Sequence, residues 1–407
     1  MSDRLRRPDG AVPRVLIAGG GVAALEAVLA LRACAGMRVD IELIAPDAEL
    51  RYPPLDVVEP FGLAPPRVEL AQALDAVGAR QRLDALVDVD TGEHRLRTRD
   101  GAVLPYEALV LAVGTRRLPP APGMLAYGDA PSRAAFGALL DAAQQGQVER
   151  LLFAVPPGVH WSLPLYELAV MTARRLAGRG VHITIVSPES APLSIFGGRA
   201  SGRLLEHLQS LGIAFVWGTH VERVVRGEVV LAYNARRLPA DRVVTIPTLA
   251  GPALSGIPHD HDGFIPVDRH GAVVGVPDVY AAGDATDFPI KQGGLATQQA
   301  DAVAEAIAAR AGALVDPAPF RPVLRGMLLT GEQPHYLEAG VGRGREASAS
   351  SSTPLWWPPA KVAGRYLSPF LADRLGEALP SEAEPPPAWA ADAVPVELAA
   401  AALEGAR

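Results

Sequence analysis

The feature that most constrains the fold is a glycine-rich turn near the start of the chain, set between an apolar run and a helical pattern. Residues 15–19 (VLIAG) suit a strand that is buried on both faces. Residues 22–35 are rich in Ala and Leu and predict a helix, and residues 39–45 (VDIELIA) predict a second strand. Together they make a βαβ unit of about 30 residues, so we expect an α/β fold.

The turn fits the G-x-G-x-x-G/A pattern of dinucleotide binding through Gly19, Gly21 and Ala24. The first glycine makes the tight turn, the second lets backbone N–H groups approach a pyrophosphate, and the small third residue lets helix and strand pack closely. The acid that usually ends the second strand is missing, because Ala45 stands there. Asp47, two residues on, is either its substitute or a solvated turn residue.

Two later strands end in residues that suit a flavin nucleotide. Residues 104–119 (LPYEALVLAVGTRRLP) predict a strand that ends at Gly114, and residues 276–288 (VPDVYAAGDATDF) predict one that ends at Gly283 and Asp284. A carboxylate there accepts a hydrogen bond from a ribitol hydroxyl, and glycine lets the chain pass close to the ligand. The three segments in this order favour a flavin site over an ordinary turn.

Composition excludes several classes of protein. The net charge of −7 argues against a duplex-binding protein, which needs a basic face. The single cysteine, Cys34, provides no intrachain disulfide and no CxxC pair, and we interpret it as a small buried residue. We expect a cytoplasmic protein, because the sequence shows no signal peptide and no apolar run long enough to span a bilayer. The segment with His259 and His261 is interpreted as a solvated loop, and no metal site is expected.

The motifs VLIAGGGVAA (15–24), LVLAVGT (109–115) and VYAAGDAT (279–286) resemble those of the two-dinucleotide-binding-domain flavoproteins, the pyridine nucleotide–disulfide oxidoreductase superfamily. Within it, LIAPDAELRYPPL (43–55), IVSPESAPLSIFG (185–197) and LWWPPAKVAGRYL (355–367) are similar to the branch of sulfide:quinone reductase and flavocytochrome c sulfide dehydrogenase. The cysteines of that branch are absent here.

The resemblance implies two Rossmann-like dinucleotide-binding domains, an FAD domain being split by an inserted NAD-type domain. On this basis, residues 10–128 and 252–322 form the FAD-binding domain, and residues 129–251 form the second, degenerate domain. Residues 323–372 would then form a C-terminal interface segment and residues 373–407 a flexible tail.

Carried over by position, the resemblance also implies which residues surround FAD. The first turn holds the pyrophosphate, the segment after the second strand lies along the adenosine and phosphate side, and the later strands reach the flavin and its ribitol. The residues assigned in this way are Gly19, Gly21, Val22, Ala23, Ala24, Pro46, Arg51, Leu86, Gly114, Gly283 and Asp284.

Leu295 and Ala296 are expected to open a helix whose N-terminus points at the flavin pyrimidine edge, where two-electron reduction places negative charge. The chain contains only two lysines, Lys291 and Lys361. Lys291, four residues before Leu295, is either a charge beside the flavin or a solvated loop residue. Lys361 is assigned to the second nucleotide or substrate on the strength of the family alone.

The second domain repeats the βαβ pattern, but its turn reads PPGVHWS (156–162) instead of a glycine-rich sequence. Two prolines remove N–H donors and Trp161 would crowd a pyrophosphate, so ordinary NAD(P)H docking is handicapped. Glu189, after the next strand, either holds a ribose diol, which would favour NADH over NADPH, or is a turn residue.

In sulfide-oxidising relatives the same proline-rich loop carries a cysteine that faces the flavin. Trp161 and Ser162 stand in that neighbourhood here, so a route through a protein persulfide or disulfide is rejected. His160, on the same loop, is either a general base for a substrate proton or a residue that caps the turn.

Two apolar features mark the C-terminal part. Leu367, Phe370, Leu371, Leu375 and Leu379 form a stripe at helical spacing, for which burial at a subunit contact is favoured over membrane docking. The tryptophan pair at 356–357 either stacks on a flavin or quinone ring or plugs the domain interface.

The sequence therefore predicts an FAD-dependent oxidoreductase that passes two electrons from a small-molecule donor to a quinone-like or protein acceptor, without a redox-active disulfide. NADH is left open as the donor. The alternatives are a flavin-binding electron-transfer or redox-sensing subunit, and a sulfide-oxidiser scaffold with a changed substrate. Nucleic acid is not an expected partner. A homodimer and peripheral contact with the inner face of the membrane stay open.

Overall fold

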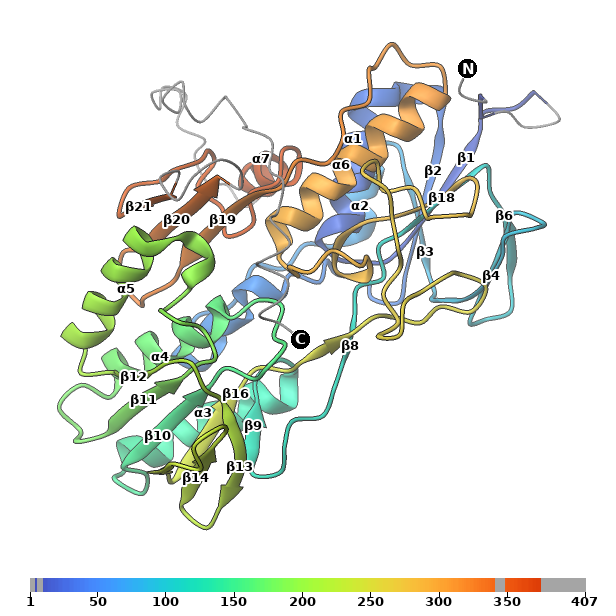
Figure 1. Ribbon diagram of the computed structural model, residues 1–407. Coiled ribbons are helices and arrows are strands. Elements are labelled where there is room, and N and C mark those ends of the chain that lie inside the picture. Colours follow the sequence, from blue (N-terminus) through green and yellow to red (C-terminus); the bar gives the residue numbers. More distant parts are fainter. Residues whose placement is uncertain (1–3, 6–9, 341–347, 375–407) are drawn as a thin grey trace.

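Two five-stranded parallel sheets form the frame of the molecule, which the computed structural model describes over residues 4–5, 10–340 and 348–374 (Figure 1). The first sheet has the order β18-β7-β1-β2-β3. Its strands are β1 (Arg14–Ala18), β2 (Asp40–Ala45), β3 (Arg80–Leu83), β7 (Ala108–Leu111) and β18 (Val279–Ala281). The late strand β18 pairs with β7, so the chain returns to its first sheet after a long excursion. This return is the split domain that the sequence predicts.

Strands β1, β2, β7 and β18 of the first sheet are buried because both faces are covered, whereas the edge strand β3 is partly exposed. On one face, Val15 and Ile17 join a core with α1 (Val22–Ala35) and α6 (Gly293–Arg310), and these two helices pack against each other. On the other face, Leu16 and Ala18 join a core with the small antiparallel sheet β4 (Leu86–Asp90), β5 (Arg95–Thr98) and β6 (Val103–Pro105). The continuous apolar run of β1 is thus explained by burial on both sides.

The second sheet has the order β12-β11-β10-β16-β9 and repeats this plan. Its strands are β9 (Met124–Ala126), β10 (Arg150–Ala154), β11 (His182–Val186), β12 (Ala214–Val216) and β16 (Arg242–Thr245). One face packs on α3 (Ala130–Gln144), α4 (Leu163–Arg175) and α5 (Gly198–Ser210). The other face packs on an antiparallel sheet of β13 (Val221–Val225), β14 (Glu228–Leu231) and β15 (Arg237–Pro239).

The chain passes between the two units at a short antiparallel ribbon of β8 (Arg116–Arg117) and β17 (Leu249–Ala250). Strand β9, which follows β8, already pairs with β16 of the second sheet. The second unit therefore begins before residue 124, earlier than the predicted boundary at 128/129. The sequence did not reveal this crossing, because β8 and β9 are only two and three residues long and are joined by a short link with three prolines.

A third, smaller sheet bridges the two units. It consists of β19 (Val323–Leu328), β20 (His335–Gly340) and β21 (Ser348–Ser351), and it contacts α4 and α5 of the second unit and α6 of the first. In Figure 1 it lies between α5 and the pair formed by α6 and α7 (Leu367–Arg374). One-turn helices complete the fold: η1 (Gly36–Arg38), η3 (Ser194–Phe196) and η4 (Gly283–Ala285). The longer 3-10 segment η2 (Pro53–Phe61) and helix α2 (Leu70–Asp75) lie between β2 and β3.

The C-terminal apolar features are covered within the chain. Leu367, Phe370 and Leu371 pack into the core of the first unit beside α1, which corrects the expected subunit contact for this part of the stripe. Leu375 and Leu379, like the predicted tail beyond residue 374, lie outside the described residues. Trp356 is buried edge-on against Tyr336 and donates to the Ala360 carbonyl, so it plugs the interior rather than offering a stacking face. Among the helices described, none has the length and apolarity needed to cross a bilayer.

Candidate functional site

The turn after β1 is built so that backbone, and no side chain, faces its open side. Gly19 has φ +134°, and a Cβ placed on it would lie 2.1 Å from the carbonyl oxygen of Ala112. Gly20 packs on Ala45, whose Cβ would be 3.0 Å from a Cβ at position 20. Gly21 precedes α1 without any side-chain cap. The first amides of α1 are therefore left for a ligand, as in an anion site at a helix N-terminus.

Segments far apart in sequence converge on this turn. The amide of Arg51 donates to the Gly20 carbonyl over 3.0 Å, which brings the strand after β2 alongside the glycines. Gly283, at the end of β18, has φ +77°, and its Cβ would fall 2.9 Å from that of Ala23 and 3.4 Å from that of Ala296. The three motifs noted in the sequence thus meet at one end of the first sheet, at the carboxyl ends of its strands.

Asp284 stands out at this end because its carboxylate has no hydrogen-bond partner among the described residues, although it is half-buried. Burial raises the pKa of this carboxyl, and the Lys291 charge partly offsets the rise. A buried polar group without a partner costs free energy unless a ligand satisfies it. An uncapped helix start, a glycine at position 19 where a side chain would clash with the backbone, and an unsatisfied acid fit the pyrophosphate and ribitol of FAD.

The other residues assigned to this cofactor differ in how close they lie to the turn and in whether their side chains are exposed or paired. Gly114, with φ +73°, follows β7, next to β1. The Arg51 side chain is exposed and lies 3.4 Å from Asp47, so Asp47 is paired within its own loop. Pro46 is exposed directly after β2. Leu86 opens β4, one short link beyond β3 and outside the five-stranded sheet.

The start of α6 differs from the expectation. The helix begins at Gly293 and is capped by Gln292, whose Oε1 accepts the Leu295 amide over 2.9 Å. The Ala296 amide also donates to the backbone of Gln292. Leu295 and Ala296 therefore have no free amide to offer a flavin, which corrects their predicted role. Gly293 and Gly294 are the residues whose amides are free at this end, as far as the described residues go.

Lys291 is buried, and its ammonium is engaged by its own loop. Nζ donates to the carbonyls of Thr286 at 2.5 Å and Phe288 at 2.7 Å, and it lies 3.8 Å above the centre of the Phe264 ring. Burial lowers its pKa to about 8, and Asp284 and two other acids partly oppose this. The solvated-loop alternative is therefore wrong. The lysine fixes the turn that carries Asp284 and places a positive charge beside it.

The second unit has the same strand–turn–helix arrangement but few backbone donors. Pro156 and Pro157 follow β10, and Pro164 lies in the first turn of α4, so none of these positions has an N–H. The Leu165 amide donates to the Ser162 carbonyl over 3.0 Å. The N-terminus of α4 consequently has little to offer a pyrophosphate, as the sequence predicts.

Glu189 is not available for a ribose. Its carboxylate accepts hydrogen bonds from the hydroxyls of Tyr166 at 2.5 Å, Ser187 at 2.9 Å and Ser162 at 3.2 Å. Burial raises the pKa of Glu189, and the same three donors limit the rise. Both oxygens are thus engaged inside the second unit, which corrects the interpretation of Glu189 as a nucleotide-binding acid. Trp161 lies in the turn before α4, next to Ser162, and its ring packs edge-on against Phe196.

His160 links the two units. Its Nδ1 lies 2.9 Å from the carbonyl oxygen of Pro289, in the loop that follows Asp284, and its ring meets Phe264 edge-on at 5.5 Å. Burial lowers the pKa of His160, and hydrogen bonds to the Pro289 and Leu249 carbonyls partly offset this effect. The histidine thus ties the second unit to the Asp284 turn.

Lys361 is placed where no substrate reaches it. Its ammonium is buried in an ion pair with Glu167 of α4 and also donates to the Met327 carbonyl at 2.5 Å. Glu167 in turn accepts the Leu329 amide at 2.7 Å. The expected role of Lys361 at the second nucleotide or substrate is corrected to a structural one, which joins the C-terminal segment, the bridging sheet and the second unit.

Two residues that shape this end were missed. Gln299 on α6 accepts the Gly283 amide at 2.7 Å and donates to the Thr286 hydroxyl at 3.2 Å, so it holds both sides of the Asp284 turn. The Tyr52 hydroxyl accepts the Val362 amide at 3.1 Å and ties the segment after β2 to the C-terminal segment. A buried glutamine in an Ala-rich helix was a signal for the first. Nothing in the sequence pointed to the second.

Comparisons with known proteins agree with this geometry. Residues 167–308 match the family described as pyridine nucleotide-disulphide oxidoreductase. The chain is 28% identical over 288 residues to apoptosis-inducing factor 3 of Mus musculus, covering 68% of this chain and 46% of the mouse protein, which is thus more than twice as long as the matched part.

A bacterial relative is matched over more of its length. The chain is 29% identical over 303 residues to the ferredoxin–NAD(+) reductase component of the biphenyl dioxygenase system of Paraburkholderia xenovorans, covering 70% of each chain. Among solved structures, the sulfide:quinone oxidoreductase of Aquifex aeolicus superposes with a TM-score of 0.75 at 19% identity, covering 83% of this chain and 86% of that one. Together with the geometry above, these findings show that the chain is similar to the pyridine nucleotide-disulphide oxidoreductase family over residues 167–308 and shares the fold of the flavoprotein reductases it superposes on.

Proposed function

We propose that this flavoprotein passes two electrons through FAD from a small-molecule donor to a redox protein or a quinone-like molecule, and that pyridine nucleotides are poor donors for it. The observation that carries the proposal is the contrast between the two strand–turn–helix motifs. The first leaves backbone amides and the Asp284 carboxylate without partners, whereas the second has prolines in its turn and a fully engaged Glu189.

When bound, FAD supplies the two-electron redox chemistry, and the protein binds and tunes it. The amides after Gly21 would hold the pyrophosphate, and Asp284 would accept a ribitol hydroxyl. The free amides of Gly293 and Gly294, with the Lys291 charge behind the Asp284 turn, supply positive potential where negative charge develops on reduction. His160, whose pKa is lowered by burial, is the residue we assign to accepting a substrate proton.

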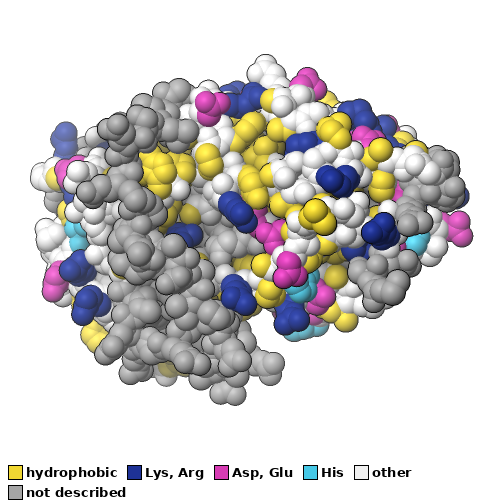
Figure 2. Space-filling view, turned by 90° about the horizontal axis from the view of Figure 1, so that it is seen from above, with side chains coloured by type: hydrophobic (Ala, Val, Ile, Leu, Met, Phe, Trp, Pro, Cys, Tyr) yellow, Lys and Arg dark blue, Asp and Glu magenta, His cyan; other side chains and the backbone are white. Residues whose placement is uncertain are grey.

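The acceptor is proposed at the level of class. The bacterial relative is named as a reductase of a ferredoxin, which supports a redox protein, and the structural neighbour is named for a quinone. The chain has one cysteine, so it cannot form an internal disulfide to carry electrons between donor and flavin. On the face shown in Figure 2, Lys and Arg side chains lie singly among acidic and apolar ones, without the basic stripe that a nucleic-acid partner requires.

The deciding experiment is an anaerobic titration of the flavin spectrum in the FAD-loaded protein with NADH, NADPH, sulfide and a quinol. We expect NADH to bleach the flavin only at millimolar concentration, and a quinol to leave most of the flavin oxidised, because the proposed flow of electrons is from the flavin to the quinone. Rapid, saturable bleaching at micromolar NADH in a stopped-flow instrument would contradict the proposed weakness of the second site. Purified protein that takes up no FAD on reconstitution would overturn the whole proposal.

The same titration separates the alternatives. A sulfide-oxidiser scaffold with a changed substrate would react with neither pyridine nucleotide. A flavin-binding electron-transfer or redox-sensing subunit would turn over slowly with every small donor and would copurify with a stable partner. As a location we propose the cytoplasm, with peripheral contact at the inner face of the membrane if the acceptor is a membrane quinone. A homodimer remains part of the proposal, to be tested by light scattering.

A further inference from the structure

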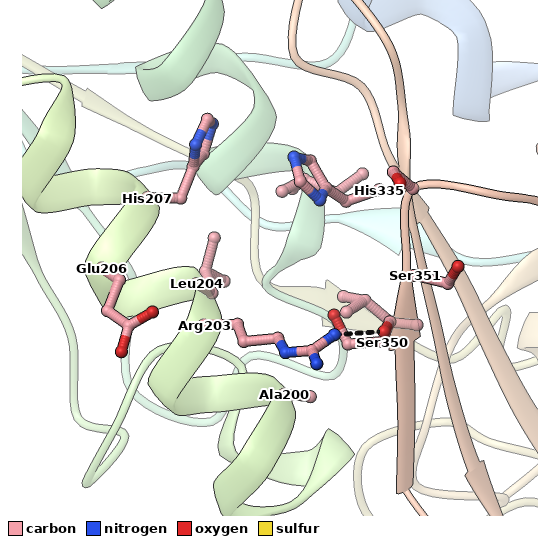
Figure 3. A pocket seen from close by; sticks show the side chains of 11 residues that line it. Ala200, Arg203, Leu204, Glu206, His207, His335, Ser350 and Ser351 are labelled. Atoms are coloured by element: carbon pink, nitrogen blue, oxygen red, sulfur yellow. Dashed lines mark hydrogen bonds between the residues drawn. The ribbon is translucent and has the colours of Figure 1, made fainter.

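A cavity of about 350 Å³ lies between α5 of the second unit and strands β20 and β21 of the bridging sheet (Figure 3). Its volume falls in the lower part of the range found for small-molecule sites. It is separate from the flavin end of the first sheet, because none of the residues that line it belongs to the first unit. The residues that line it come from two parts of the fold, so a ligand there would bridge the second unit and the C-terminal sheet.

One side of the cavity carries positive or protonatable side chains without partners. The Arg203 guanidinium spends one N–H on the Ser350 carbonyl at 2.6 Å, and its other N–H groups have no partner among the described residues. The rings of His207 and His335 lie 5.1 Å apart. His207 Nε2 is buried without a hydrogen bond, and no described residue hydrogen-bonds to the His335 ring. In Figure 3, Arg203 extends toward Ser350 and the two imidazoles lie near one another above it.

The rest of the lining is apolar. Leu204, Leu328 and Leu337 are buried and form its floor together with Ala200. Among the described residues that line the cavity, Glu206 is the only acid, and its side chain is exposed. A cavity with a guanidinium and two imidazoles on one side and aliphatic carbons on the other matches a molecule that has both a charged and an apolar part.

We propose that this cavity is a binding site for a small carboxylic acid with an apolar body. The carboxylate accepts from Arg203 and the two histidines, as guanidinium and imidazolium groups pair with carboxylates. The hydrocarbon part lies on the leucine floor. This site is independent of the electron donor and acceptor of the flavin.

Binding is coupled to proton uptake. Burial lowers the pKa of both His207 and His335, and their mutual repulsion and the Arg174 charge act in the same direction. The charged groups that face His207 are Arg174 on α4, His335 on β20 and Glu332 in the loop between β19 and β20. Glu332 is itself paired with Arg174 at 2.5 Å. A bound carboxylate favours the protonated rings, so the acid binds more tightly as pH falls from 8 to 6.

The test is calorimetric titration of the FAD-loaded protein with benzoate, its neutral isostere benzamide, and inorganic phosphate, at pH 6 and pH 8. Benzoate keeps its charge at both values, since free carboxyl groups titrate near pH 4. We expect one benzoate site per chain, about tenfold or more tighter than benzamide or phosphate, and about fivefold or more tighter at pH 6 than at pH 8. The variant His335→Gln should flatten the pH dependence.

Arg203→Gln is the decisive variant, because Arg203 is exposed and its replacement leaves the fold intact. We expect benzoate affinity to fall about tenfold or more. Arg199→Gln is the matched control, since it removes the same charge from an exposed position of the same helix outside the cavity. Equal affinity for benzoate and benzamide, or for benzoate and phosphate, would overturn the proposal. So would an unchanged affinity in Arg203→Gln, or the absence of benzoate binding up to about 10 mM.

Discussion

The two units of this protein have the same architecture, but the turn after the first strand is rich in glycine in one unit and rich in proline in the other. Each has a parallel sheet with helices on one face and a three-stranded antiparallel sheet on the other. In the first unit the turn consists of glycines that keep side chains out, and Gly19 adopts a φ that favours glycine. In the second unit the corresponding turn contains Pro156 and Pro157 and closes on the first unit through His160. The second unit therefore has the fold of the first without the backbone donors of its turn, which shows that the fold does not require the ligand site.

The acids near the two turns show the same division. Asp284 is half-buried with no hydrogen-bond partner in the described part of the chain, whereas Glu189 accepts three hydroxyl groups. A binding group keeps its hydrogen-bonding capacity for the ligand, and a structural group spends it within the fold. The comparison teaches that unsatisfied hydrogen-bonding capacity, rather than the presence of an acid after a strand, distinguishes the proposed nucleotide site.

The largest expected effect comes from adding one methyl group to the first turn. Gly19→Ala forces a Cβ to within 2.1 Å of the Ala112 carbonyl oxygen at a φ of +134°, so the turn must distort. Strain of this kind costs about 1–3 kcal/mol, so FAD affinity should fall about tenfold to a hundredfold. The flavin-to-protein absorbance ratio after purification and equilibrium dialysis measures the loss.

Gly158→Ala is the matched change in the second turn. Gly158 also has a positive φ, +66°, but no atom lies within 4 Å of its would-be Cβ. We expect full FAD content and a stability loss of only about 1 kcal/mol. If both variants lost FAD equally, the contrast between the turns would have no functional meaning.

The next effect separates the two acids. Asp284→Ala should weaken FAD binding about tenfold, the value of a hydrogen bond to a charged group, without lowering the melting temperature of the apoprotein. Glu189→Ala should leave FAD content unchanged and reduce the free energy of unfolding by about 1–3 kcal/mol, because three buried hydroxyls lose their acceptor. Isothermal titration with FAD and urea unfolding distinguish these outcomes, and the reverse pattern would exchange the two roles.

A smaller effect tests the charge behind the flavin end. Lys291→Met should lower the flavin midpoint potential by about 30 mV, equivalent to about tenfold for a two-electron couple. Since the pKa of Lys291 lies at about 8, the ammonium is charged below that pH and neutral well above it. The difference between the midpoint potentials of variant and wild type should therefore reach its largest value at pH 6.5 and should vanish by about pH 9.5. A gap that is absent at pH 6.5 would remove Lys291 from the electrostatics of the site.

The smallest effect concerns the contact between the units. His160→Leu removes the hydrogen bond to the Pro289 carbonyl and should cost about 1 kcal/mol in the free energy of unfolding. His160→Asn keeps an N–H donor close to the position of Nδ1 and should retain most of that stability. Equal losses in the two variants, measured by urea unfolding, would show that the ring contact with Phe264 matters more than the hydrogen bond.

Features encoded over short stretches were predictable from the sequence. The glycine turn and the handicapped second turn follow from local residues with strict backbone limits, as with glycine at Gly19 and proline at Pro156. The split of the first unit was implied by the family resemblance. The meeting of Gly283 with the first turn was also predictable, because strands that share a sheet bring their ends together.

Side-chain partners across long distances were not predictable. The pairing of Lys361 with Glu167, the three donors on Glu189 and the Gln292 cap of α6 depend on tertiary contacts that no local pattern reports. Of these residues, Glu189 was a candidate for a ribose because it follows a strand, and Lys361 was assigned to a nucleotide or substrate because of the family resemblance. Only the structure shows that these side chains are hydrogen-bonded or ion-paired to other residues of the protein.

The buried pair of Glu167 and Lys361 has a consequence for biosynthesis. The two residues are 194 positions apart, so the acid leaves the ribosome long before its counter-charge exists. Sealing a lone carboxylate into the interior costs several kcal/mol. The nascent second unit must therefore keep helix α4 hydrated, or its acid protonated, until the final stretch of polypeptide arrives. The interface can therefore exclude water only after the segment that carries Lys361 has been synthesised.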